Sequence, residues 1–125
     1  MPSKSKGPYN GLLNINKPAG ITSHDVVDRV RRILGQKRVG HAGTLDPAAT
    51  GILLVCAGQA TRLVEYLVPG TKTYQGAIAL GRSTNTYDRE GETSAEADTT
   101  HLDRRLVEGT MAGFIGEIEQ VPPPY

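Results

Sequence analysis

Cysteine, large aromatic side chains and long apolar runs are all scarce in these 125 residues. There is one cysteine, no tryptophan and one phenylalanine. A single cysteine excludes an internal disulfide and any metal site built from several cysteines. No apolar run approaches the ~20 residues that a membrane helix needs, and the first residues lack the apolar segment of a signal peptide. We therefore expect a cytoplasmic protein that forms one domain, or part of one, with no membrane segment and no metal site.

Charge is distributed unevenly along the chain, although its net value is only +1. Residues 1–62 carry nine Lys and Arg against three acids, a balance of +6, whereas residues 63–125 carry five against ten, a balance of −5. A positive surface attracts the phosphates of nucleic acids. The candidate phosphate contacts are Arg29, Arg31, Arg32, Lys37 and Arg38. An ordinary solvated helix face explains the same residues equally well.

Hydrophobic periodicity predicts interleaved strands and helices without long parallel βαβ units. This pattern favours an α+β fold with a mixed, mostly antiparallel sheet flanked by helices. The polar residues 1–10 predict a flexible leader. Strands are expected at 11–16, 51–57 and 72–80, and helices at 22–35, 63–68 and from 100 onward, the first and last with capping-box-like starts. Cys56 lies inside the second apolar strand, which indicates a small core residue.

The stretch GHAGTLDPAATG, residues 40–51, crowds three glycines, a histidine, a carboxylate and a proline together. Glycine permits backbone conformations or close approaches that a side chain forbids, and Pro47 fixes the backbone just after Asp46. A turn in which Asp46 is only a turn former is one interpretation. The other is a functional carboxylate, because the apolar strand that follows at once anchors the loop to a rigid element.

These twelve residues resemble the signature of the TruB family of tRNA pseudouridine synthases. Three other stretches resemble family motifs in the same order: NKPAGITSHD, a motif thought to be largely structural, then KTY, then LGRSTNTYDREG. The resemblance implies a pseudouridine synthase fold, with residues 11–125 forming the N-terminal portion of the catalytic domain. It also implies an isomerase that converts uridine 55 in the T loop of tRNA to pseudouridine. The T arm of tRNA is then the partner, and neither a cofactor nor a protein partner is implied.

The resemblance also implies roles for individual residues. Asp46 matches the catalytic nucleophile, and Tyr74 matches a tyrosine that packs against the target base. His41 matches a substrate-binding histidine, and Gly43 and Thr44 of the same loop are further candidate substrate contacts. Asp88 is a candidate for ordering the site or its own loop. From the residues alone, a core tyrosine is the commoner interpretation of Tyr74, and a turn acid is an equal interpretation of Asp88.

The reaction explains why a carboxylate is needed. Isomerisation breaks the bond from ribose C1′ to N1, turns the uracil and rejoins it through C5. It requires a carboxylate at the ribose and base, a group that holds the detached uracil, and flipping of the nucleotide out of its stack. Asp46 can attack C1′ or C6, or act as a base to give a glycal, and the sequence leaves these routes open.

Other functions fit the sequence less well. A phosphate-binding nucleotidase would need the Gly-x-x-x-x-Gly-Lys-Ser/Thr spacing, which the loop lacks. An aspartyl-phosphate phosphotransferase would need a second carboxylate at position 48, which is alanine. A non-catalytic RNA-binding module or tRNA-folding factor is the serious alternative, because the basic half of the chain would serve it equally well.

We further expect this chain to be an incomplete enzyme. Its last residues, QVPPPY, resemble a family stretch that continues into Ser-Ala-x-Lys. In the family, an arginine that pairs with the nucleophilic aspartate, an apolar contact to the base and a C-terminal RNA-binding region all follow that point. The isolated chain is therefore expected to be inactive, and either self-associated or marginally folded.

Overall fold

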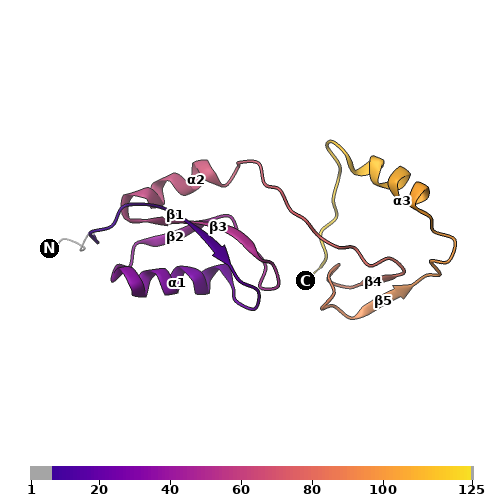
Figure 1. Ribbon diagram of the computed structural model, residues 1–125, viewed down its shortest axis with the longest axis horizontal. Coiled ribbons are helices and arrows are strands. Elements are labelled where there is room, and N and C mark those ends of the chain that lie inside the picture. Colours follow the sequence, from indigo (N-terminus) through magenta and orange to yellow (C-terminus); the bar gives the residue numbers. More distant parts are fainter. Residues whose placement is uncertain (1–6, 125) are drawn as a thin grey trace. The chain divides into compact units, whose positions relative to one another are not determined.

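A computed structural model describes residues 7–124, and these residues fall into two compact units that divide between Thr73 and Tyr74. The first unit contains β1 (Gly11–Lys17), α1 (Ser23–Leu34), β2 (Val39–Ala42), β3 (Gly51–Ala57), the 3-10 helix η1 (Gly58–Leu63) and α2 (Val64–Leu67) (Figure 1). The second unit contains β4 (Arg82–Thr84), β5 (Thr93–Glu96), α3 (Arg104–Met111) and the 3-10 helix η2 (Ala112–Phe114). The α+β class with antiparallel strand pairing is confirmed.

The sheet of the first unit has the order β1-β3-β2, with both pairs antiparallel and β3 in the centre. Lys17 at the end of β1 pairs with Gly51 at the start of β3, and Ala42 at the end of β2 pairs with Leu54. The turn after β1 and the loop between β2 and β3 therefore leave the sheet at the same end. The start of α1 lies at this end too, because α1 begins six residues after β1.

Helix α1 forms as predicted, and local interactions define both of its ends. Thr22 is the N-cap: its side chain accepts a hydrogen bond from Asp25 N at 3.0 Å, and the Asp25 carboxylate accepts one from Thr22 N at 2.8 Å. This reciprocal pair is a capping box. Gly35 ends the helix in the left-handed conformation, with φ at 61°, which glycine adopts without steric cost.

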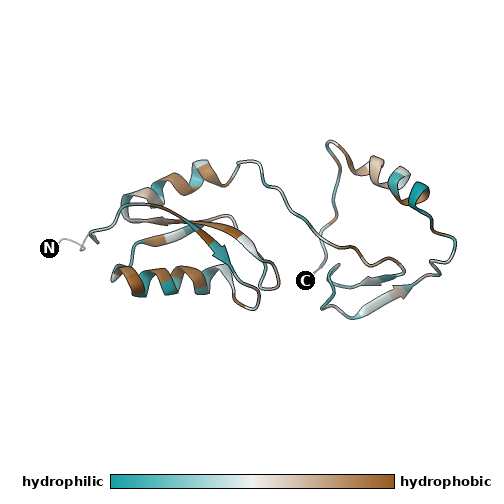
Figure 2. Ribbon diagram, in the orientation of Figure 1, coloured by the Kyte–Doolittle hydropathy of each residue, from teal (hydrophilic) through white to brown (hydrophobic). Residues whose placement is uncertain are grey.

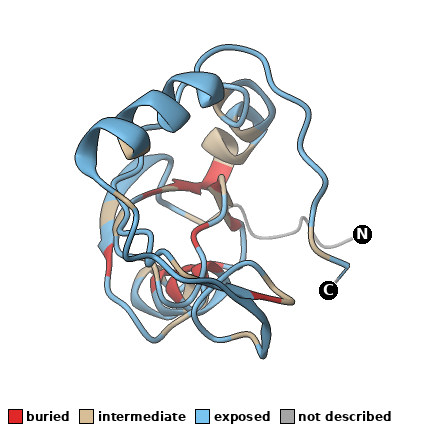
Figure 3. Cartoon of the chain, turned by 90° about the vertical axis from the view of Figure 1, so that its right-hand side faces the viewer, coloured by how far each residue is buried: buried red, intermediate tan, exposed pale blue. Residues whose placement is uncertain are grey.

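The hydrophobic core lies between α1 and one face of this sheet. The apolar stripe of α1 is visible as alternating hydrophobic and hydrophilic segments in Figure 2. The buried residues are concentrated in this part of the chain (Figure 3). The core cluster consists of Val26, Val27, Val30, Val39, Leu45, Leu53, Val55 and Ala57.

The opposite face of the sheet faces α2, which lies on the other side of it from α1 (Figure 1). Cys56 points to this face and is fully buried, as expected for a small core residue. Burial raises the pKa of its thiol. In the part of the chain that the structure covers, no helix is long and apolar enough to cross a membrane.

The flexible leader predicted for residues 1–10 lies mostly outside the described residues. Its last residues are held by hydrogen bonds. Tyr9 N donates to Gln36 Oε1, Gln36 Nε2 donates to Tyr9 O, both at 3.1 Å, and Gln59 N donates to Asn10 Oδ1 at 2.7 Å. Gln36 is buried, and its side-chain amide bonds to both the N–H and the C=O of Tyr9, as the backbone of a neighbouring strand would.

The strand predicted at residues 72–80 does not form. The segment is exposed throughout and belongs to neither sheet. Alternating apolar residues indicate only that one face could be buried, and a strand also needs a partner whose backbone completes its hydrogen bonds. No described segment supplies that partner.

The third predicted helix also begins later than expected. Its N-cap is Asp103, whose carboxylate accepts a hydrogen bond from Leu106 N at 2.7 Å, so α3 starts at Arg104. The predicted capping residue, Thr100, instead donates from its backbone to Asp98 Oδ1 at 3.0 Å and from its hydroxyl to Asp98 Oδ2 at 2.7 Å. Asp98 therefore caps the preceding turn, and Asp103 caps the helix.

The second unit, described by itself, has little core. Between residues 74 and 124, Thr84 is the only buried residue. Large apolar side chains stay exposed, among them Ile78 at 84%, Ile115 at 82% and Phe114 at 68%. So much exposed apolar surface is typical of a segment that packs against something else.

Neighbouring residues of β3 test where the core lies. Leu53 is 2% exposed and Ile52 is 68% exposed. We expect Leu53→Ala to lower the free energy of unfolding by about 2–5 kcal/mol, because it removes packed methyl groups and leaves a cavity. Ile52→Ala should change it by no more than about 0.5 kcal/mol. Urea denaturation of both variants measures the difference, and equal losses would contradict this assignment of the faces.

Candidate functional site

The loop between β2 and β3, residues 43–50, carries the candidate catalytic carboxylate at the end of the sheet. Leu45 is 9% exposed and belongs to the core cluster, whereas Thr44 and Asp46 on either side of it are exposed. One apolar side chain therefore anchors the loop while its polar neighbours face solvent. This arrangement presents the Asp46 carboxylate on a supported backbone.

Ser23 holds the residue before Asp46. Its hydroxyl donates to Leu45 O at 3.0 Å and accepts from Leu45 N at 2.9 Å, and Ser23 is 3% exposed. A single buried hydroxyl thus satisfies both backbone groups of Leu45. Ser23 lies within the first turn of α1, so the loop is attached directly to that helix.

Lys17 holds the residue after Asp46. Its side chain is fully buried, and Nζ donates to three carbonyl oxygens: Ile21 O at 2.8 Å, Pro18 O at 3.0 Å and Pro47 O at 3.3 Å. The backbone N–H of Gly20 also donates to Pro47 O, at 2.8 Å. A buried ammonium needs every donor satisfied, so the turn after β1 and the Asp46 loop are tied together.

Two of the three loop glycines have the backbone conformations that the sequence suggested. Gly43 has φ at 92° and Gly51 at 122°, in a region that residues with a Cβ rarely adopt. Gly40 lies inside β2 without a positive φ and with open space where a Cβ would stand. His41 Nδ1 contacts Gly43 O, and because a carbonyl can only accept a hydrogen bond, Nδ1 is the donor in this contact.

Lys72 is a neighbour of the loop that sequence reasoning did not single out. Its Cε lies 3.4 Å from the position that a Cβ on Gly43 would occupy, and its Nζ donates to Val68 O and to Gly70 O. The residue belongs to the KTY motif, in which only the tyrosine was assigned a role. Gly43 and Lys72 are 29 residues apart, and no local sequence pattern indicates that they lie close together.

Ser23 and Lys17 were likewise missed as supports of the loop. Both lie in the motif that was thought to be largely structural. Their residue types give no hint of the partner, because Ser23 is 22 residues from Leu45 and Lys17 is 30 residues from Pro47. Only the pairing of β1 with β3 brings these segments together.

Tyr74 and Asp88 belong to the second unit, and the Asp46 loop belongs to the first. Tyr74 lies in the extended segment and is 66% exposed, which does not match a core tyrosine. Asp88 Oδ1 accepts hydrogen bonds from Thr86 Oγ1 at 2.7 Å, Glu90 N at 2.9 Å and Gly91 N at 3.1 Å. These bonds lower the pKa of Asp88, the Thr86 hydroxyl contributing most. Asp88 thus orders its own loop.

The five candidate phosphate contacts differ in their exposure and in the hydrogen bonds that their side chains already make. Arg31 is committed within the fold: its guanidinium donates to Asp28 Oδ1 at 2.9 Å and to Val39 O at 3.0 Å. Arg29 and Arg32 are exposed on α1.

Lys37 and Arg38 follow α1, and Arg38 donates to Thr61 Oγ1 at 2.8 Å. They precede Val39, which pairs with the far end of β3. Six residue steps of about 3.3 Å therefore separate that end, by roughly 20 Å, from the start of the strand beside the Asp46 loop.

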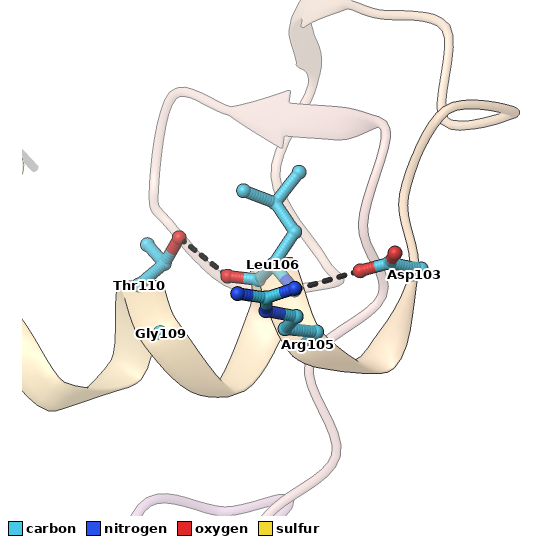
Figure 4. Close-up of a pocket in the computed structure, with 5 residues that line it drawn as sticks. All are labelled: Asp103, Arg105, Leu106, Gly109 and Thr110. Atoms are coloured by element: carbon cyan, nitrogen blue, oxygen red, sulfur yellow. Dashed lines mark hydrogen bonds between the residues drawn. The ribbon is translucent and has the colours of Figure 1, made fainter.

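The pocket in the second unit contains none of the predicted site residues. It is lined by Asp103, Arg105, Leu106, Gly109 and Thr110, all from α3 and its N-cap (Figure 4). Thr110 Oγ1 donates to Leu106 O at 2.9 Å within the helix. Leu106 N also donates to the Asp103 cap at 2.7 Å, so the pocket is the side of a capped helix. Within residues 7–124, no group of three His, Cys, Asp or Glu is arranged to hold a metal ion.

Residues 31–125 match the family model described as TruB family pseudouridylate synthase, N-terminal domain. Proteins named tRNA pseudouridine synthase B are similar over most of the chain. The one from Symbiobacterium thermophilum is 54% identical over 121 residues, which are 97% of this chain and 40% of that protein. The one from Dehalococcoides mccartyi is 53% identical over 116 residues, 93% of this chain and 39% of that protein. The chain thus spans about two-fifths of the length of these relatives.

A solved structure shares the fold. A chain of the Cbf5–Nop10–Gar1 complex superposes with a TM-score of 0.64 at 32% identity. The match covers 91% of this chain and 29% of that chain. The chain therefore shares its fold with this solved structure over most of its length.

The hydrogen bonds of Asp88 predict a local titration. Its pKa is lowered from 3.8, so the ordering of the loop is fully present above the unfolded value and is lost as pH falls through the lower, folded value. We expect the amide chemical shifts of Glu90 and Gly91 to titrate together with a midpoint below 3.8. NMR from pH 6 to 2 measures this, with Asp88→Asn as the control that removes the transition. A midpoint at or above 3.8 would contradict the observed bonding.

Proposed function

The chain belongs to the TruB family of pseudouridylate synthases, and on that premise we propose that it is the N-terminal portion of the catalytic domain of a tRNA pseudouridine synthase. The proposed reaction is isomerisation of uridine 55 in the T loop of tRNA, in the cytoplasm. The observation that carries the proposal is the presentation of Asp46: an exposed carboxylate whose neighbours on both sides are held by the buried Ser23 and Lys17.

Asp46 is the proposed nucleophile. A carboxylate that must reach the ribose or the base of a flipped nucleotide has to be exposed and yet fixed in direction. Leu45 in the core and the two held carbonyls meet the second requirement, and the exposure of Asp46 meets the first. Attack on C1′, attack on C6 and proton removal toward a glycal all use this same group.

The remaining assignments follow from family membership and from what each side chain offers. Tyr74 is exposed, so its ring is available to stack on the detached uracil, and its hydroxyl is available for removal of the C5 proton after the new C1′–C5 bond has formed. His41, Gly43 and Thr44 belong to β2 and the Asp46 loop and are the proposed contacts to the target nucleotide. Nε2 of His41 is not used in the contact with Gly43 O and is available for a hydrogen bond with RNA. Asp88 is proposed to act by keeping its own loop ordered.

Binding of the T arm is proposed to involve the exposed cations of the basic half. Arg29 and Arg32 are the better candidates, because Arg31 is already engaged by Asp28 and Val39. Lys37 and Arg38 would meet a more distant part of the RNA. A non-catalytic RNA-binding module or tRNA-folding factor is favoured by the same charges, and it differs from the enzyme in needing no carboxylate at position 46.

We also propose that activity requires more protein than these 125 residues. Asp46 has no cation within ion-pairing distance in the portion of the chain that is described. The second unit leaves its large apolar side chains exposed. The relatives are about two and a half times as long as the matched region. Family membership implies a downstream arginine, which would supply the cation for Asp46. It also implies further apolar residues downstream, which would cover exposed apolar side chains.

Replacement of the carboxylate tests the proposed function. Asp46→Asn keeps the size of the side chain and removes its charge, so we expect the single-turnover rate of pseudouridine formation to fall by at least about 10²–10⁴-fold. Affinity for a T-arm RNA should change little. The assay uses the full-length protein that contains this chain, with residues 1–125 alone as an inactive comparison. Wild-type product from Asp46→Asn would eliminate the nucleophile assignment, and activity in residues 1–125 alone would refute the need for further chain.

Salt dependence tests the RNA surface. Each phosphate contact that is lost should flatten the log–log slope of affinity against salt by about one unit. We expect the double variant Arg29→Glu, Arg32→Glu to weaken binding and flatten the slope by about two. Arg104→Glu, Arg105→Glu makes the same charge change in the acidic half and should leave the slope unchanged. Equal effects of the two double variants would indicate that only net charge matters.

A further inference from the structure

We propose that Ser23 is a positioning residue for catalysis, which aims the Asp46 carboxylate through the peptide of Leu45. This inference rests on the proposed role of Asp46 in isomerisation. It assigns the Ser23 hydroxyl a part in the rate of the chemical step, beyond attaching a loop to a helix.

The first support is the completeness of the Ser23 interaction. Its hydroxyl both donates to Leu45 O and accepts from Leu45 N, at 3.0 and 2.9 Å, so one side-chain atom fixes both ends of the residue before Asp46. Ser23 and Leu45 are both buried, so water does not compete for these groups. Among side chains of this size, only a hydroxyl can donate and accept from one atom with full strength.

The second support is the shortness of the chain between two held points. Ser23 holds the carbonyl of Leu45, and Lys17 and Gly20 hold the carbonyl of Pro47. Peptide bonds are planar and the proline ring fixes its own φ. The rotations left between these carbonyls are φ and ψ of Asp46 and ψ of Pro47. With both ends held, the direction of the Asp46 side chain is strongly restricted.

The third support is the rigidity of α1, the helix that contains Ser23. Ser23 lies in the first turn of α1, between the two residues of the capping box, and Val26 and Val27 of the same helix are in the core. A side chain that aims a catalytic group through hydrogen bonds is effective only if its own element does not move. Removal of the hydroxyl would release the Leu45 end of the loop while Lys17 still held the other.

The residue next to Ser23 provides a matched control. Thr22 also uses its hydroxyl at the start of α1, accepting from Asp25 N at 3.0 Å and donating to Asp25 Oδ2 at 2.7 Å. Thr22 is exposed, and these bonds lie within the capping box. Thr22→Ala therefore weakens the same helix terminus without releasing Leu45. A purely structural role of Ser23 predicts that the two alanine variants behave alike.

The experiment compares Ser23→Ala, Thr22→Ala and Asp46→Asn in the full-length protein with a T-arm RNA. The single-turnover rate at saturating RNA, the dissociation constant of the RNA and the melting temperature are measured for each. We expect Ser23→Ala to lower the rate about 10- to 100-fold, because small displacements of a reacting group have effects of that size. Its dissociation constant should stay within about twofold of wild type. Thr22→Ala should lower the melting temperature and retain the wild-type rate at a temperature where it is folded.

The outcomes separate this inference from the proposed function. If Asp46→Asn is inactive and Ser23→Ala reacts as fast as Thr22→Ala, the positioning role is overturned while the enzyme remains. If Asp46→Asn retains the wild-type rate, the proposed function and this inference both fall. Should Ser23→Ala not fold, Ser23→Cys preserves the volume with a weaker donor and acceptor, and it must show a lowered rate with unchanged RNA affinity. A wild-type rate in Ser23→Cys would overturn the inference equally.

Discussion

The hydrogen bonds that two buried polar side chains make to the Asp46 loop are the constraint on which the site depends. Lys17 and Ser23 are almost wholly withdrawn from water, and a buried ammonium or hydroxyl without partners is strongly unfavourable. The carbonyls of Leu45 and Pro47 are among those partners. The loop cannot leave its position without leaving these groups unsatisfied. The same hydrogen bonds therefore stabilise the first unit and hold the Asp46 carboxylate in place.

This coupling explains why the sheet needs its particular order. With β3 between β1 and β2, the end of β1 and both ends of the 43–50 loop lie at the same end of the sheet. The start of α1 lies at that end too. A helix packed on the core then supplies Ser23, and the end of a strand supplies Lys17. The second unit contrasts with this arrangement. The hydrogen bonds of Asp88 order its loop, yet the large apolar side chains of the second unit face solvent. Such exposure is typical of a segment that packs against another surface.

Local signals predicted β1, α1 and β3, whereas β2, β4 and β5 and the contacts over long sequence separations were not predicted. The capping box of Thr22 and Asp25, the C-terminal Gly35 and the apolar run of β3 are encoded within a few residues, and all appear as predicted. The alternation at 72–80 was misleading, because alternation records a potential buried face and not the presence of a pairing strand. Asp46 could be singled out from its unusual neighbours. Its supports Lys17 and Ser23 could not, because they are far away in sequence and become neighbours only through strand pairing.

The claim that the loop is fixed before any RNA arrives can be measured directly by amide hydrogen exchange on the free protein. The N–H groups of Leu45, bonded to Ser23, and of Gly20, bonded to Pro47, report on the two sides of Asp46. If the carboxylate is pre-positioned, both amides exchange far more slowly than in an unfolded chain, at rates comparable to the amides of β3. Exchange of both at unfolded-chain rates, with β3 still protected, would contradict the account.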